Sequence, residues 1–178
     1  MARDHARLFT RIWSDPAWRK LTAAQQRAYT QVLSDPSLTY CGVTSVTMKR
    51  WALQSVDTPE RLLRKAFDGL AEARWLVFDW DTEEVLVRSF IRNDKVLCVP
   101  NVAKSAYAAY QAVLSPVIRA EVLVEVHRIR KGHPEAYRDP AIAAVEPWFT
   151  EPLPEGLPEP LPEGLAQGLD QWLPEGLR

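Results

Sequence analysis

Apolar residues recur at helical spacing in two segments near the start of the chain. The first runs from Thr22 to Leu33, and Thr22 together with Gln25 has the Thr-x-x-Gln spacing of a capping box. The second, TSVTMKRWALQ, can turn Met48 and Trp51 inward while its basic residues stay outside. The turn-forming stretch SDPSLTYCG separates them, so the pattern predicts two consecutive helices.

A third helix has the clearest pattern in the chain. Thr58 and Pro59 are typical of an N-cap followed by a first-turn proline, and RLLRKAFDGLAEAR continues from them. Its predicted apolar face consists of Leu63, Ala66, Phe67 and Leu70. The opposite face carries Glu60, Arg61, Arg64, Lys65 and Asp68.

The hydrophobic period then changes from helical to alternating. WLVFDW and EEVLVRSFI are rich in β-forming residues, and a short acidic reversal joins them, so we expect a β-hairpin. We expect its apolar side, Val77, Val85 and Val87, to lie on the helices, because an isolated hairpin is marginal in water. Two helices, a short turn and a following hairpin predict a winged helix-turn-helix over residues 1–97.

Residues 98–132 predict a helical hairpin. Its second helix starts at Ser115 and Pro116, another N-cap and first-turn pair, and ends at Gly132. Apolar residues cover more than one face of this helix, so residues 116–131 are predicted either to contact a partner, such as a second copy of the chain, or to be buried within a small domain. The expected fold class is α+β, mostly helical.

Charge and composition change together after Gly132. Residues 1–132 carry 20 basic and 14 acidic side chains, whereas residues 133–178 carry 2 and 9. The latter segment contains the repeat EPLPEGLP followed by EPLPEGLA, with leucine at every fourth position from Leu153 to Leu177. Proline at this density excludes a regular helix, so residues 133–178 predict an acidic, disordered or extended tail. Such a tail has either no specific role or a protein partner, which Trp148, Phe149 and Trp172 would anchor.

Tryptophan usage has two interpretations. Aromatic side chains interleaved with basic ones can stack on unpaired bases. Core spacing is the better explanation for Trp13, Trp51 and Trp75, whereas Trp80, near the hairpin turn, is expected to be exposed.

Several functional classes lack support in the sequence. The chain shows no Gly-rich phosphate loop, nucleophile elbow or metal-ligand spacing, so we expect no enzymatic activity, no cofactor and no metal. Cys41 and Cys98 form no CxxC pair. Without a membrane-spanning run or a signal peptide, the chain is expected to be soluble and cytoplasmic.

The first part of the chain resembles a known family. IWSDPAWRKLTAAQQRAY, TYCGVTSVTMKRWA and LAEARWLVFDWDTEEVLVRSFIRNDKV are similar to the N-terminal winged-helix region of phage and prophage replication-initiation proteins, over roughly Ala2 to Lys104. The resemblance implies a double-stranded DNA-binding protein that acts in replication initiation or its control.

In a helix-turn-helix, the second helix enters the major groove and neighbouring basic residues contact phosphates. The predicted DNA-contacting residues are Lys49, Arg50, Arg61, Arg64, Lys65, Arg88 and Arg92. The alternative for the charged residues of the third helix is that they form an ordinary solvent-exposed face without a ligand. The acidic hairpin turn would be repelled by phosphates, which keeps open two other functions: a protein-interaction adaptor whose winged helix does not touch DNA, and a transcriptional regulator.

Overall fold

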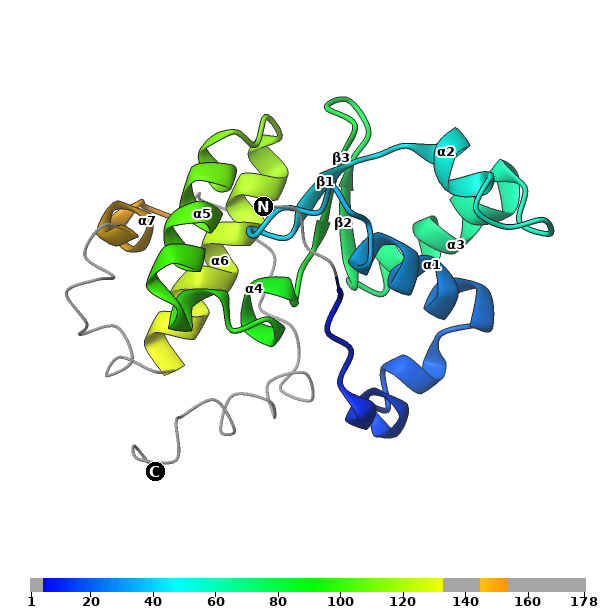
Figure 1. Cartoon of the computed structure of the whole chain (residues 1–178), viewed down its shortest axis with the longest axis horizontal. Coiled ribbons are helices and arrows are strands. Elements are labelled where there is room, and N and C mark those ends of the chain that lie inside the picture. Colours follow the sequence, from blue (N-terminus) through cyan, green and yellow to red (C-terminus); the bar gives the residue numbers. More distant parts are fainter. Residues whose placement is uncertain (1–4, 133–144, 154–178) are drawn as a thin grey trace.

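The computed structural model describes residues 5–132 and 145–153, and they form an α+β, mostly helical fold, as predicted (Figure 1). A small sheet stands between two groups of helices, with α1–α3 on one side and α5–α7 on the other. The 3-10 helices, which lie outside this layering, are η1 (Thr10–Ser14), η2 (Trp18–Lys20) and η3 (Val96–Cys98).

Helix α1 (Ala23–Leu33) begins where the capping box was predicted. The Oγ1 of Thr22 accepts from the backbone N–H of Gln25 at 3.2 Å, and the Oε1 of Gln25 accepts from the backbone N–H of Thr22 at 2.7 Å. These reciprocal bonds satisfy two N–H groups that a helix start otherwise leaves open. The predicted start of this helix is therefore confirmed.

Helices α2 (Met48–Ala52) and α3 (Glu60–Glu72) follow in the predicted order. The indole N–H of Trp51 donates to the carboxylate of Asp35 at 2.7 Å, and the Trp51 ring meets Phe67 edge-on at 5.4 Å. Trp51 therefore fixes α2 to the end of α1 and to the buried stripe of α3.

The predicted cap of α3 is wrong by one residue. Pro59 occupies the N-cap position, and no side chain caps this helix. The Thr58 hydroxyl instead donates to Ser55 and Asp57, within the connection from α2. Pro59 has no N–H to donate, and its extended ψ of 155° places the first helical residue at Glu60.

Three antiparallel strands, β1 (Val43–Ser45), β2 (Leu76–Asp79) and β3 (Glu84–Val87), form the sheet in the order β1-β3-β2. In β2 and β3, Leu76 pairs with Val87, Phe78 with Val85, and Val77 with Leu86. Paired residues share a face of an antiparallel sheet, so Val77 lies on the opposite face from Val85 and Val87. The prediction that these three valines form one apolar side is wrong, because both faces of this sheet are covered.

The face that carries Val77 and Leu86 packs against α6. Helices α5 (Pro100–Gln111) and α6 (Pro116–Gly132) form the predicted helical hairpin, and the Ser115 hydroxyl accepts from the backbone N–H of Ile118 at 3.1 Å. Helix α6 contacts β2, β3 and the short helices α4 (Phe90–Asn93) and α7 (Glu146–Thr150). No helix among the described residues is long and apolar enough to span a membrane.

Most of the broad apolar surface of α6 is buried within its own chain. The α6 residues that contribute to the hydrophobic core are Ile118, Val122, Leu123, Val126 and Ile129. The sheet, α4 and α7 pack on this helix, so the alternative of a buried helix accounts for most of its apolar residues. Val117 is 54% exposed, and the homodimer through residues 116–131 stays a prediction.

The first described part of the predicted tail also belongs to the core. In α7, Trp148 and Phe149 are buried, and the Trp148 ring lies 5.4 Å from that of Tyr110 in α5. Glu151 accepts a hydrogen bond from the Tyr110 hydroxyl at 2.7 Å. The prediction that these two aromatic residues anchor a separate partner is therefore wrong. Residues 133–144 and 154–178, including Trp172, lie outside the described residues.

One tryptophan prediction is wrong as well. Trp13 is 63% exposed on η1, and the neighbouring Trp18 is buried in its place, edge-on to Tyr29 and Trp75. Trp51 and Trp75 are buried, as predicted. The proline and tryptophan spacing of this segment does not reveal which of two nearby indoles turns inward.

Candidate nucleic-acid interface

The exposed face of α3 carries the cations that the sequence placed there. The buried stripe of α3 consists of Leu63, Ala66, Phe67 and Leu70. Arg61, Arg64 and Lys65 are exposed on the opposite side, and Lys49 and Arg50 are exposed on α2. Because Trp51 holds α2 against α3, these five basic residues belong to two adjoining helices at one end of the molecule.

Arg64 is the most constrained of these cations. Its Nε lies 3.3 Å from the carboxylate of Asp68, one turn along α3, and its guanidinium carbon lies 3.5 Å from the centre of the Trp80 ring. Trp80 in turn stacks on Phe78 with ring centres 4.8 Å apart. Trp80 is half-buried, so the sequence-based expectation of an exposed ring is only partly correct. Arg64 therefore connects α3 to the β2–β3 hairpin.

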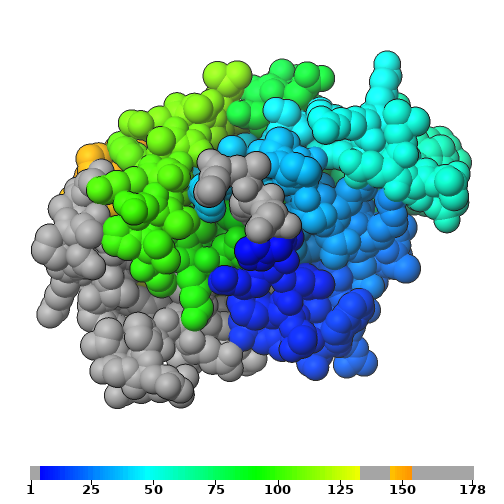
Figure 2. Space-filling view, in the orientation of Figure 1, coloured from blue at the N-terminus to red at the C-terminus, as the bar shows by residue number. Residues whose placement is uncertain are grey.

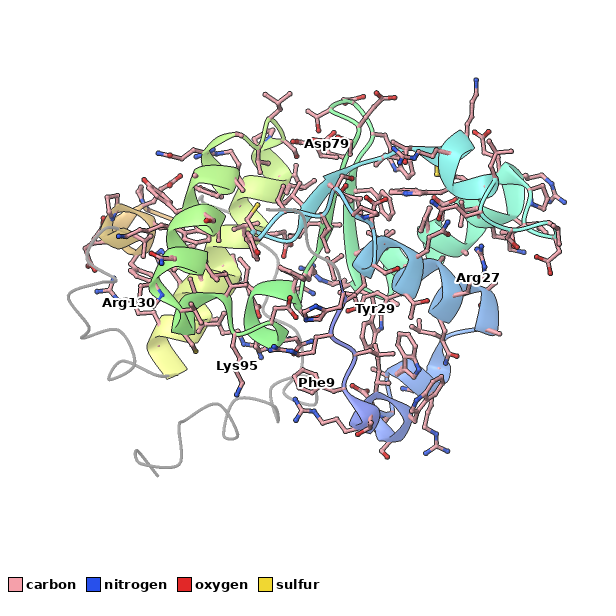
Figure 3. All side chains as sticks on the ribbon, viewed as in Figure 1. Phe9, Arg27, Tyr29, Asp79, Lys95 and Arg130 are labelled. Carbon is pink, nitrogen blue, oxygen red and sulfur yellow. The ribbon has the colours of Figure 1, made fainter. Side chains whose placement is uncertain are left out.

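Two of the acidic side chains near the hairpin turn have structural roles. Asp79, labelled beside the turn in Figure 3, accepts from the backbone N–H groups of Asp81 and Thr82 at 3.0 and 3.3 Å. The Ser115 hydroxyl and these N–H groups hold the pKa of Asp79 below its ordinary value. The carboxylate of Glu84 accepts from the backbone N–H groups that precede α6, at Leu114 (3.1 Å) and Ser115 (2.7 Å).

The remaining acidic residues, Asp81 and Glu83, are exposed on the turn itself. Negative charge at this position disfavours insertion of the turn between phosphates. Any contact between the hairpin and DNA would therefore need to come from its sides.

The structure corrects the prediction for Arg88 and Arg92. Only 8% of Arg88 and 3% of Arg92 is exposed. The Nε of Arg88 lies 3.2 Å from the Glu121 carboxylate, and the Nη1 of Arg92 lies 3.1 Å from the Glu125 carboxylate. Both arginines therefore form buried ion pairs with α6 and cannot reach a DNA backbone.

Glu121 also accepts a hydrogen bond from Arg74 at 2.8 Å, and Arg88 donates to the backbone carbonyl of Arg74 at 3.1 Å. Burial lowers the pKa of Arg88 and Arg92, and burial raises the pKa of Glu125 against the opposing field of Arg92. We call Arg74, Arg88, Arg92, Glu121 and Glu125 the buried charge cluster.

The sequence held a signal for this cluster. Glu121 and Glu125 are one helical turn apart in the otherwise apolar run of α6, and a carboxylate in such a position is buried only when it is paired. Arg88 and Arg92 show the same four-residue spacing, which makes them candidate partners for these carboxylates.

Comparisons of the chain with protein-family models, with curated proteins and with solved structures found no match. The functional argument therefore depends on the residues of this chain and on their arrangement.

Proposed function

We propose that this protein binds double-stranded DNA through a winged helix-turn-helix, with α3 as the helix that enters the major groove. The observation that carries the proposal is the position of the exposed cations of α3. They lie opposite a stripe that packs on α1 and α2, and the β2–β3 hairpin follows directly in the chain. A helix presented in this way can insert its outer face into a groove while its inner face stays in the core.

The individual cations have distinct expected roles. Arg61 and Lys65 are exposed near the start of α3, where a recognition helix reaches base edges, and arginine can bond a guanine with two donors. Lys49 and Arg50 are exposed on α2, and we expect them to contact phosphates, which fix the orientation of a protein on the duplex. Arg64 contributes less directly, because Asp68 and Trp80 already engage it.

Within this proposal, the biological role follows from the resemblance of residues 2–104 to phage and prophage replication-initiation proteins. We infer that the chain acts in replication initiation or in its control. Transcriptional regulation is the neighbouring role, because the same interface would serve it.

The test is a duplex-binding titration of the Arg61→Ala/Lys65→Ala variant at two salt concentrations. Alanine is a good helix former, so helix content and melting should be unchanged. We expect affinity to fall about tenfold or more, and the salt dependence to flatten by about one unit of slope for each of the two side chains that contacts a phosphate as well as a base.

The matched control removes two cations from the other side of the molecule. Lys104 in α5 and Lys131 at the end of α6 are exposed, and the Lys104→Ala/Lys131→Ala variant has the same net charge as the test variant. Equal loss of affinity in both variants would show that only net charge matters, and would overturn the assignment of α3. A parent chain that binds no duplex at low salt would overturn the DNA-binding proposal itself.

A second candidate function is a protein-interaction adaptor, and the exposed carboxylates of Asp81 and Glu83 favour it. On this alternative the hairpin turn faces a basic protein surface instead of solvent. Asp81→Asn/Glu83→Gln would then weaken binding of that partner, whereas in the DNA-binding proposal it leaves duplex affinity unchanged or increases it.

A further inference from the structure

The connection between α2 and α3 exposes two aliphatic side chains next to each other in a shallow groove. Leu53 is 87% exposed and Val56 107% exposed, and the groove that they line continues to Ala52 and Pro59. Figure 2 shows α2 and this connection, in cyan, projecting from the body of the molecule. We call this feature the corner groove. Single exposed aliphatic residues are ordinary, whereas two that share a groove offer an apolar surface that a partner can cover.

The corner groove lies in a basic environment. Between residues 49 and 65 the cations Lys49, Arg50, Arg61, Arg64 and Lys65 outnumber the acidic residues Asp57 and Glu60. Lys49 and Glu60 both line the groove. An occupant with apolar side chains and negative charge would complement this surface.

The C-terminal 25 residues of the chain, 154–178, have this composition. Leucine recurs at every fourth position between Leu157 and Leu177. The acidic side chains between the leucines are Glu155, Glu159, Glu163, Asp170 and Glu175, against a single basic residue, Arg178.

The segment is long enough to reach the corner groove, although it starts at the far end of the molecule. Helix α7 lies at the opposite end from α2 (Figure 1). An extended polyproline-like chain advances about 3.1 Å per residue, so 25 residues span about 78 Å. A compact unit of about 150 residues has a radius of gyration of only about 15 Å.

We propose that residues 154–178 bind back onto the corner groove of their own chain, with a leucine between Leu53 and Val56 and neighbouring carboxylates next to Lys49 and Arg61. The repeat offers several equivalent leucines to one groove, and the tether keeps them at a high effective concentration, so a weak contact is populated. This contact does not depend on the proposed DNA binding. Where both occur, they compete, because they share Arg61.

The experiment uses the full chain and no DNA. A nitroxide is attached at residue 167 through Gln167→Cys in a Cys98→Ser background, which leaves only the buried Cys41 as a native thiol. Amide signals of ¹⁵N-labelled protein are then compared with the nitroxide oxidised and reduced. We expect loss of intensity at residues 49–62, and a weaker loss at high salt, because the screening length falls from about 10 Å at 0.1 M to about 3 Å at 1 M.

Two variants separate groove binding from general proximity. Leu53→Ser/Val56→Ser removes the aliphatic groove residues without touching the core, and should abolish the loss of intensity at residues 49–62. Leu114→Ser changes an equally prominent leucine, 75% exposed between α5 and α6, and should have no effect. Intensity loss spread evenly over all surfaces, or a loss that survives the groove substitutions, would overturn the proposal.

A mixed sample decides between the chain's own tail and that of a second copy. Unlabelled protein carrying the nitroxide is added to ¹⁵N-labelled protein without it. We expect no loss of intensity at residues 49–62 in this sample. A loss as large as in the first sample, in which each chain carries both the nitroxide and ¹⁵N, would show binding between copies and refute the intramolecular contact.

Discussion

Arginines on α3 and arginines after β3 occupy opposite environments in this protein. Arg61 points to solvent on the outer face of α3, whereas Arg88 and Arg92 are buried against Glu121 and Glu125 of α6. The difference does not come from the local sequence around each arginine. It comes from α6, which brings carboxylates to one set and not to the other.

The comparison separates cations that can recognise a ligand from cations that join parts of the fold. An exposed arginine is hydrated and gains energy when it meets phosphate. A buried arginine has already lost its water, so its partner is required for stability. In this chain the buried charge cluster joins the strand end and α4 to α6, whereas Arg61 and Lys65 of α3 are exposed.

The largest expected effect comes from removing the shared carboxylate of the cluster. Glu121→Ala leaves Arg88 buried without its ion-pair partner and removes the hydrogen bond from Arg74. We expect the free energy of unfolding to fall by about 3–5 kcal/mol in urea titrations at neutral pH. Glu146→Ala, which breaks the exposed pair with Arg130, is the control and should cost less than about 1 kcal/mol. Equal costs would show that burial does not distinguish the two pairs.

Replacing both members of a buried pair should be far less harmful than removing one. Arg92→Met/Glu125→Leu substitutes apolar groups for two charges at the α4–α6 contact. Such exchanges are neutral or stabilise by about 1–4 kcal/mol, so the double variant should melt at or above the parent temperature, and Arg92→Met alone should melt below it. Duplex affinity should not change in the double variant. A loss of affinity would mean that Arg92 acts on DNA after all.

A smaller effect is expected at Arg64, which belongs to both classes. Trp80→Leu removes the ring that lies under the guanidinium but keeps an apolar side chain on Phe78. The cation–π contact at this half-exposed site is worth about 0.5–1 kcal/mol, and unfolding should become easier by a similar amount. Freed from the ring, Arg64 should bind duplex as well as or better than before. A large fall in affinity would instead place Trp80 in the interface.

The elements of the fold were predictable where the signals were local. The capping box at Thr22 and Gln25 fixed the start of α1, and the change from helical to alternating period located the β2–β3 hairpin. What failed was the assignment of faces. A strand buried on both sides shows no clean alternation between apolar and polar residues, so Val77 could not be separated from Val85 and Val87.

The candidate site divides in the same way. The outward position of Arg61 and Lys65 follows from the stripe on the other side of the same helix, which the sequence displays. The burial of Arg88 and Arg92 depends on α6, about thirty residues away in the sequence. The pattern around the two arginines does not reveal this, and the signal lies in α6, where Glu121 and Glu125 interrupt an apolar run. The docking of Trp148 was missed for a related reason, because the proline-rich composition around it masked a short helix that packs on α5.

The smallest expected effect is a difference in pH dependence between the two regions. Asp35 follows α1 and accepts a hydrogen bond from Trp51 of α2. Burial raises the pKa of Asp35, but hydrogen bonds from Ser37 and Trp51 outweigh burial, so this pKa lies below its ordinary value. Its stabilising contribution is therefore present above the unfolded-state pKa and is lost as pH falls through the folded-state pKa. In the buried charge cluster, burial raises the pKa of Glu125, so its contribution is present at pH values below the unfolded-state pKa and is lost as pH rises through the folded-state value.

Conservative amide variants isolate the two contributions. Urea unfolding of Asp35→Asn, Glu125→Gln and the parent should be compared between about pH 3 and about pH 7, where carboxylates titrate. Relative to the parent, Asp35→Asn should lose less stability on acidification, because the group that must take up a proton is gone. Glu125→Gln should change the slope in the opposite direction, since this variant no longer gains the stability that the parent gains on protonating Glu125 in the folded state. Slopes, not absolute stabilities, are compared, because each amide also changes a hydrogen bond. If both variants shift the slope in the same direction, the two carboxylates share one kind of environment. The contrast between the region that holds α2 and α3 and the buried charge cluster then fails.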